Sequence, residues 1–395
     1  MISLRGWDVR SCRFIGLVLV AMSALAASWL AVSSASALAT PTVSCSLYAA
    51  PSGSDSSGDG SQGNPFQTAQ HLVSVLAAGQ TGCLMSGTYD SSPGLSFEKS
   101  GSAGAPITLA SAPGQTATLA GGYVYMPTGS NYVTLEDLSI NGAQTTQVSV
   151  QIFGSHDSLI GDNITNDEQH NSCIIMGFPG YSPVPTATLI TDNVIHQCGS
   201  TADGNQNHAI YFSQSQDATV TDNVIWGTAA FAIHLYADAD GNTIEHNVID
   251  DNGYGVIFGS ADDGGSGSND NTVAYNVITN SSVGMGAQQS WGGAVGTGNT
   301  FAHNCLDSNA NGNVETPYGF NSSANVTAAP GYADAAAHSY SLSSSSPCLA
   351  VVGYAGLSTT TTTTTAPETA ATASRAKTKR RTARATHRRR HARRA

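Results

Sequence analysis

The sequence predicts an all-β fold, a parallel β-helix in which one short structural unit is stacked many times. A motif of the type Asp-Asn-Val-Ile returns every 24 to 30 residues, with its asparagine at the positions Asn163, Asn193, Asn223, Asn247, Asn276 and Asn304. Each period contains a second short apolar run bounded by Gly, Asn or Asp, such as Ala232-Ile-His-Leu235. Runs of this length are too short for helices, and two or three strands per period are typical of β-helix coils.

The N-terminal 39 residues have the layout of a secretory signal. Three arginines precede an apolar run over 14–30, and the small residues that end at Ala39 resemble a cleavage site. The apolar run is also close to membrane-spanning length, so a single anchor is the alternative. We favour cleavage after Ala39, which makes residues 1–39 a signal peptide and the mature protein secreted or associated with the cell envelope.

A helix is expected before the first coil. Residues 66–78, FQTAQHLVSVLAA, place apolar side chains at helical spacing. The terminal coil of a solenoid has unpaired strand edges that need protection. We therefore expect this helix to be an N-terminal cap of the β-helix domain, which extends over residues 40–357.

The C-terminal end differs in composition from the rest of the chain. Residues 358–374 form a Thr/Ala-rich linker, and residues 375–395 carry eleven arginines and lysines. Neither segment contains enough apolar residues for a core, so we expect a disordered tail. Residues 40–358 contain 25 acidic residues and one basic residue, Lys99, which gives 1 − 25 = −24.

The basic tail predicts an anionic partner. We expect it to hold an anionic polymer of the cell surface or to contact the acidic domain, with an affinity that salt reduces. No nucleic acid is expected as a partner, because an exported protein rarely meets it. We expect a monomer.

Six cysteines remain after removal of the signal, an even number that predicts disulfides in an exported protein. Cys173 begins one second apolar run, and Cys198 lies 25 residues further on, just after the next Asn-Val-Ile, so this pair would join neighbouring coils. By proximity we also expect the pairs Cys45–Cys83 and Cys305–Cys348.

The chain resembles a known superfamily at this point. The segment GNPFQTAQHLVSVLAAGQTGCLMSGTYD, then APITLASAPGQTATLAGG and the stacked Asn-Val-Ile coils, are similar to the pectin lyase-like right-handed β-helix superfamily over residues 48–350. The resemblance implies a right-handed helix. It implies no single reaction, because the superfamily includes pectate lyases, polygalacturonases, uronan epimerases, phage tailspikes and non-catalytic surface proteins.

Strand alternation selects candidate catalytic residues. If Ile233 and Leu235 point inward, His234 points outward and lies one coil, about 4.8 Å, from Tyr211. His208 precedes its strand and is expected at the bend beside them. Histidine and tyrosine are suitable bases and acids for sugar chemistry. We therefore predict His208, Tyr211 and His234 as catalytic.

Acidic and aromatic neighbours complete the predicted site. Tyr236 and Asp203 are the candidate substrate-binding residues. The loops also carry four carboxylates that could hold Ca²⁺, although such aspartates are more often turn residues: Asp238, Asp240, Asp262 and Asp263. No other cofactor is expected.

The expected partner is an extracellular or cell-wall polysaccharide, processed by a lyase- or epimerase-type reaction. Pectate lyases of this fold use Arg or Lys beside calcium, and Lys99 is the only basic residue of the domain, far upstream of the candidate site. A glycosidase needs two carboxylates, and Asp262 and Asp263 resemble such a pair only weakly. The alternative function is a non-catalytic, adhesin-like β-helix that binds glycans at the cell envelope.

Overall fold

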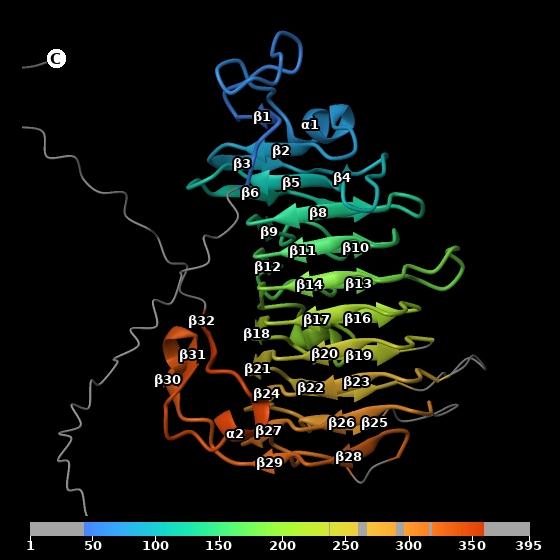
Figure 1. Ribbon diagram of the computed structural model, residues 1–395, viewed down its shortest axis with the longest axis vertical. Coiled ribbons are helices and arrows are strands. Elements are labelled where there is room, and N and C mark those ends of the chain that lie inside the picture. Colours follow the sequence, from blue (N-terminus) through green and yellow to red (C-terminus); the bar gives the residue numbers. More distant parts are fainter. Residues whose placement is uncertain (1–42, 237, 260–266, 290–295, 316–317, 359–395) are drawn as a thin grey trace, which may run out of the picture. The chain divides into compact units, whose positions relative to one another are not determined.

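The computed structural model describes residues 43–236, 238–259, 267–289, 296–315 and 318–358. It confirms the predicted fold class, because three parallel sheets run along the solenoid (Figure 1). The predicted signal, almost all of the linker, the basic tail, Asp262 and Asp263 lie outside the described residues. Within the described residues no helix is long and apolar enough to cross a bilayer.

Eight successive coils contribute one strand to each sheet in chain order, and the coils at the ends contribute fewer. The first sheet consists of β1 (Leu47–Ala49), β2 (Thr81–Leu84), β5 (Ile107–Ser111), β8 (Val133–Glu136), β11 (Ser158–Ile160), β14 (Leu189–Thr191), β17 (Thr219–Thr221), β20 (Thr243–Glu245), β23 (Thr272–Ala274), β26 (Thr300–Ala302) and β28 (Asn321–Ser323). The second sheet consists of β3 (Gly87–Asp90), β6 (Ala117–Ala120), β9 (Ser139–Asn141), β12 (Asn163–Thr165), β15 (Val194–His196), β18 (Val224–Trp226), β21 (Val248–Asp250), β24 (Val277–Thr279), β27 (Cys305–Asp307) and β29 (Val326–Thr327). The third sheet consists of β4 (Gly94–Ser96), β7 (Tyr123–Met126), β10 (Val150–Ile152), β13 (Ile174–Met176), β16 (Ile210–Ser213), β19 (Phe231–Tyr236), β22 (Tyr254–Phe258) and β25 (Ala287–Gln289).

Aliphatic side chains stack inside the solenoid at equivalent positions of successive coils. In the first sheet Ile190, Val220 and Ile244 are paired in register, and all three are fully buried. Alternate residues of a strand point to opposite faces, so each short strand buries its central residue and directs its neighbours outward. The interior is therefore one continuous apolar core along the coils.

An asparagine ladder forms the corner between the first and second sheets. The Oδ1 of Asn223 accepts the backbone N–H of Asn193 at 3.0 Å, and Asn247 repeats this contact with Asn223. Each side-chain amide also donates to a carbonyl of the first sheet, as Asn193 does to Leu159. The residue before each asparagine is left-handed, for example Asp192 with a φ of 59°. These two residues turn the chain and satisfy buried backbone groups.

The sequence pattern placed Asn163 in the asparagine ladder, but this prediction was wrong by one residue. Asn163 is exposed and pairs with Val194, whereas Asp162 occupies the ladder and donates its N–H to Asn193 Oδ1 at 2.8 Å. The corner of this coil is formed by Gly161, with a φ of 69°, and Asp162. Glycine adopts the left-handed conformation without strain and aspartate has the same shape as asparagine, so the corner forms without its usual sequence.

A helix lies in the segment predicted for it. The helix α1 (Ala69–Val75) begins at Thr68, whose side chain accepts the N–H of His71, and it buries Leu72 beside β2. Its role as a cap of the solenoid stays a prediction.

Three disulfides are present, and they are the three pairs expected from the sequence. Cys173–Cys198 joins neighbouring coils, Cys45–Cys83 joins the N-terminal segment to β2, and Cys305–Cys348 joins β27 to the C-terminal segment.

The C-terminal segment returns along the outer side of the second sheet (Figure 1). It contains the antiparallel strands β30 (Tyr332–Asp334), β31 (Ser339–Leu342) and β32 (Gly356–Ser358), and the short helix α2 (Leu349–Val352). Tyr340 is fully buried against Val224 and Val248. The segment thereby covers apolar side chains that point outward from the second sheet.

Candidate functional site

The outer side of the third sheet brings the predicted residues together. Tyr211 of β16 is directly opposite His234 of β19, and Ser213 is opposite Tyr236. Ile175 of β13 precedes Tyr211 in this column and Ile257 of β22 follows His234. The structure therefore confirms the residue pairing that strand alternation predicted for this column.

His208 and His234 share a hydrogen bond. The distance between Nδ1 of His234 and Nε2 of His208 is 2.8 Å, and the two rings are nearly perpendicular, at 83°. The ring of Tyr211 stacks on His234 with centroids 5.1 Å apart. Tyr236 lies on the same imidazole, 5.3 Å away. Strands β16 and β19 and the bend at His208 thus assemble two imidazoles and two phenols in one cluster.

The two histidines are buried, contrary to the exposed position expected for an outward column. Their exposed fractions are 3% for His208 and 6% for His234. They still point away from the solenoid core, and a second apolar layer covers them. Phe231 lies 5.4 Å from His234 and stacks on Tyr254 at 4.4 Å, in an apolar cluster separate from the core.

The hydrogen-bonded pair has an unusual arrangement of protons. Within the described residues, His208 Nδ1 and His234 Nε2 are buried without a hydrogen-bond partner. Burial lowers the pKa of His234 to about 3, and burial together with the charge of His234 lowers the pKa of His208 well below its ordinary value. Both rings are therefore neutral at pH 7, and each carries one proton. In either tautomer, one free nitrogen is an N–H donor and the other has a lone pair.

Asp203 connects the loops beside His208. It ends the short turn Thr201–Asp203, and its Oδ2 lies 2.7 Å from His170 Nδ1 and accepts Asn207 Nδ2 at 2.8 Å. These hydrogen bonds lower the pKa of Asp203. The carboxylate thus holds the residue next to His208 in place, and its contact with a substrate stays a prediction.

The acidic loops have structural contacts of their own. Asp240 Oδ1 accepts both the backbone N–H and the side-chain amide of Asn269, at 2.7 and 3.1 Å, and Asp238 accepts from Gln214 at 3.4 Å. No group of three or more His, Cys, Asp or Glu side chains that could hold a metal occurs among the described residues. Calcium binding stays a prediction, since Asp262 and Asp263 are outside this part of the chain.

A cluster of five aromatic rings on the same sheet was missed by the sequence analysis. Tyr125 lies 5.7 Å from Phe153, Phe153 stacks on Tyr181 at 4.7 Å, and Phe178 and Tyr123 lie at the two ends. The alternation in Tyr123-Val-Tyr-Met126 was the available signal, because it directs both tyrosines outward.

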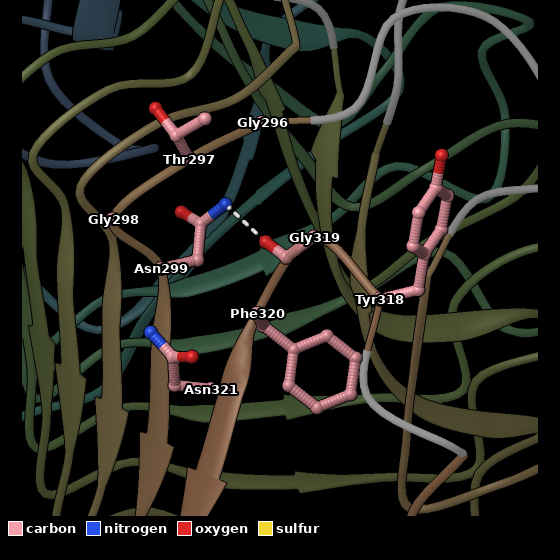
Figure 2. Close-up of a pocket in the computed structure, with 8 residues that line it drawn as sticks. All are labelled: Gly296, Thr297, Gly298, Asn299, Tyr318, Gly319, Phe320 and Asn321. Carbon is pink, nitrogen blue, oxygen red and sulfur yellow. Dashed lines mark hydrogen bonds between the residues drawn. The ribbon is translucent and has the colours of Figure 1, made fainter.

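A pocket of about 280 Å³ lies away from the histidines, near the C-terminal end of the solenoid (Figure 2). Three of its eight lining residues are glycines, and the side chain of Asn299 donates to the carbonyl of Gly319 at 2.9 Å. Tyr318 contributes the one titratable side chain of the lining. None of the predicted site residues lines this pocket.

Comparison with known proteins gives a family and a fold. The family described as "Periplasmic copper-binding protein (NosD)" matches residues 126–327, just over half of the chain. The complex of XylC with xylose is 14% identical with a TM-score of 0.54, and the match covers 71% of this chain and 69% of that one. Pectate lyase Pel9A is 16% identical with a TM-score of 0.49, covering 77% and 91%. Among curated proteins no sequence is significantly similar. At 14% identity the XylC structure shows a similar fold and nothing more.

Proposed function

The chain belongs to the NosD family, and on that premise we propose that it binds an extracytoplasmic polysaccharide on the outer side of the third sheet and processes it by proton transfer. His208, His234 and Tyr211 carry out the proton transfer, and Tyr236 and Asp203 contact the sugar. The three disulfides support an oxidising compartment outside the cytoplasm, where polysaccharides of the envelope are found.

The observation that carries the proposal is the pair of unsatisfied nitrogens at His208 and His234. A buried polar atom without a partner costs about 1–3 kcal/mol, so packing alone would favour apolar residues at both positions. The pair has a donor at one end and an acceptor at the other, which supports its use as a proton relay. Tyr211, which is only partly buried, lies between this relay and the surface.

The relay suits a lyase- or epimerase-type reaction. Once the side chains that cover the pair move aside, the unprotonated nitrogen accepts the proton at C5 of a uronic acid unit. In elimination, the electron pair forms the C4–C5 double bond while the C4–O bond breaks, and the leaving oxygen takes a proton from the phenol of Tyr211. In epimerisation, a proton returns to the opposite side of C5 instead. Both routes need one base and one acid at fixed positions.

The charge of the domain selects among such substrates. Lys99 is the only basic side chain in residues 40–358, and its Nζ donates to the carbonyl of Leu76. The acidic surface therefore repels polyanions. An esterified uronic acid is uncharged and still has the C5 proton, so a polymer with esterified carboxyl groups fits this surface better than a polyuronate.

The family's description implies copper, and the described residues do not fit a copper centre. Copper prefers imidazole, thiolate and thioether ligands. The six described cysteines are all in disulfides. No third His, Cys, Asp or Glu joins His208 and His234 within the described residues. We derive no step through copper.

Burial of the imidazoles favours a second candidate function. A sugar cannot contact the ring nitrogens of His208 and His234 directly while both are less than a tenth exposed. If the covering side chains do not move, the same surface binds a glycan at the cell envelope without reaction.

The two functions are separated by one assay. The purified protein is incubated with esterified polygalacturonan and with its de-esterified form, with and without calcium. Unsaturated sugar ends are measured by ultraviolet absorbance, and inversion at C5 is measured by NMR. We expect product from the esterified polymer, and its loss in His234→Gln and Tyr211→Phe. Asp192→Asn, an exposed position at a corner of another sheet, serves as the control. Binding without product in any condition would support the non-catalytic function.

A further inference from the structure

We propose that Tyr123, Tyr125, Phe153, Phe178 and Tyr181 form a stacking platform that holds the polysaccharide chain at a distance from the histidine pair. This inference rests on the proposed function and adds to it a second binding subsite and the class of sugar that the subsite accepts, an uncharged pyranose chain.

The platform consists of rings from consecutive elements of the third sheet. Tyr123 and Tyr125 alternate with buried residues of β7, and Phe153 directly follows β10. Phe178 and Tyr181 come from the loop after β13, which leaves the sheet (Figure 1) and closes with a hydrogen bond from the N–H of Tyr181 to the carbonyl of Phe178 at 3.1 Å. Four of the five rings are thus fixed next to one another by strands or by direct stacking.

The outermost rings are exposed in spite of their apolar character. Phe178 is 48% exposed and Tyr181 is 46% exposed, and the buried ring of Phe153 lies beneath Tyr181 at an interplanar angle of 15°. Exposed contiguous aromatic surface on a monomer usually marks a binding site. Phe153 stacks on one face of the Tyr181 ring, and 46% of the surface of Tyr181 meets solvent. This exposed aromatic surface can pack against the C–H side of a pyranose ring.

Polar groups for sugar hydroxyls border the platform. Ser96 is opposite Tyr125, and its hydroxyl donates to a carboxylate oxygen of Glu98 at 2.6 Å. Gln151 occupies the position between Tyr125 and Ile175 in the outward column. Carboxylate and amide oxygens accept hydroxyl hydrogen bonds, whereas no basic side chain of the platform can bind an anionic sugar.

The platform and the histidine pair lie along one line. The outward column runs from Tyr125 through Gln151 and Ile175 to Tyr211, three steps between adjacent strands. At a strand spacing of about 4.8 Å, the two sites are about 14 Å apart. A polymer that follows the solenoid axis would therefore occupy both sites, whereas a disaccharide would reach only one.

The test measures affinity and turnover separately. The full chain is titrated with esterified polygalacturonan by calorimetry. The double variant Phe178→Ala/Tyr181→Ala should weaken binding about tenfold or more, whereas Tyr181→Phe, which keeps the ring, should retain the affinity. Tyr318→Ala removes a 64% exposed ring at the distant pocket and should have no effect. His234→Gln should lose turnover and keep polymer binding. Thermal unfolding of each variant verifies the fold.

The outcomes distinguish this inference from the proposed function. If the double variant binds like the wild type while Tyr211→Phe weakens binding, the platform is overturned and the proposed function stands. If the double variant loses binding but no protein forms product, the platform stands and the processing reaction is overturned. Absence of polymer binding by the wild type would overturn both.

Discussion

The hydrogen bond between His208 and His234 determines how this site responds to pH. Both imidazoles are neutral in the folded protein, because burial removes the water that would stabilise a positive charge. A relay of neutral rings differs from an exposed catalytic histidine, whose protonation state changes near pH 6.5. Proton transfer through this pair would therefore depend little on pH in the neutral range.

Stability should fall in acid because of this pair. Burial lowers the pKa of His234 to about 3, whereas an unfolded histidine has a pKa of about 6.5. Below about pH 6.5 the unfolded chain binds protons that the folded pair does not. The stabilisation is therefore complete above about 6.5 and is lost progressively as the pH falls toward 3. Urea unfolding at several pH values should show a shallower decline for His208→Gln/His234→Gln than for the wild type.

A matched substitution isolates the effect of the pair. His303→Gln changes an exposed histidine and should leave the pH dependence of the wild type intact. If the wild type and the double variant lose free energy of unfolding in parallel between pH 6.5 and 4, the neutral pair does not explain the acid sensitivity.

Asp162 places a carboxyl group in the ladder, where the later coils have an asparagine amide. Its Oδ1 accepts the N–H of Leu138 at 2.8 Å, but its Oδ2 is buried without a partner among the described residues. Burial, with a smaller contribution from the charges of Asp137 and Glu136, raises the pKa of Asp162 well above its ordinary value. The stabilisation from the neutral acid is complete below the unfolded pKa of about 3.9 and is lost as the pH rises through the folded pKa.

Asp162→Asn should therefore stabilise the protein at pH 7. The new amide keeps the contact with Leu138 and can donate to a first-sheet carbonyl, as Asn193 does to Leu159. Removal of the unsatisfied carboxyl should increase the free energy of unfolding by about 1–3 kcal/mol, with a smaller gain near pH 4. Urea unfolding at pH 4 and 7 measures the difference. Asp192→Asn, at an exposed position, should change little at either pH. A destabilised Asp162→Asn would show that the carboxyl has a partner.

Strand β19 carries both residues of the solenoid core and residues of the candidate site. Its residues alternate between the solenoid interior, with Ile233 paired between Ile210 and Val256, and the outer cluster around His234. Ala232, Ile233 and Leu235 belong to the continuous core, whereas Phe231 belongs to the small separate apolar cluster beside His234. Substitutions at adjacent positions of one strand should therefore have different consequences.

Ile233→Ala should destabilise the protein whatever its function. The side chain is fully buried between two coils, and deletion of such a side chain costs about 2–5 kcal/mol. Val283→Ala, at a 51% exposed position, should change stability by no more than about 0.5 kcal/mol. Urea midpoints at constant slope measure both. Equal effects of the two variants would contradict the assignment of Ile233 to the core.

At the scale of the whole molecule, the C-terminal segment couples coils that are otherwise in contact only with their neighbours. Its Tyr354 hydroxyl donates to the carbonyl of Asn247 at 3.0 Å, and Tyr340 packs on β18 and β21. The Cys305–Cys348 disulfide fixes it to β27. In a solenoid, where each repeat contacts mainly the next, we expect such a segment to couple the unfolding of several coils.

Charge is the second property of the whole molecule. It predicts that salt has opposite effects on polygalacturonate binding by the full chain and by a chain without its basic tail. Residues 40–358 have a net charge of −24, and the sequence beyond them adds eleven basic residues. The full chain should bind polygalacturonate through these basic residues, with an affinity that falls as salt increases. A chain that ends at Ser358 should bind it weakly, and salt should reduce its repulsion. Affinity electrophoresis at two salt concentrations compares them. Equal retention of both versions would exclude the tail as the anionic-polymer contact.

The sequence by itself determined the repeating architecture and the outward column. Strand alternation has a period of two and the coils repeat every 24 to 30 residues, so local patterns predicted the register of Tyr211 and His234 and the Cys173–Cys198 disulfide. Only the tertiary structure decided the corner at Gly161 and Asp162, because the ladder hydrogen bonds and not the residue types identify it. It also decided the burial of the histidine pair and the assembly of the aromatic platform. In both cases the rings that meet come from different coils and loops, and their contacts depend on how the coils are stacked rather than on any local pattern.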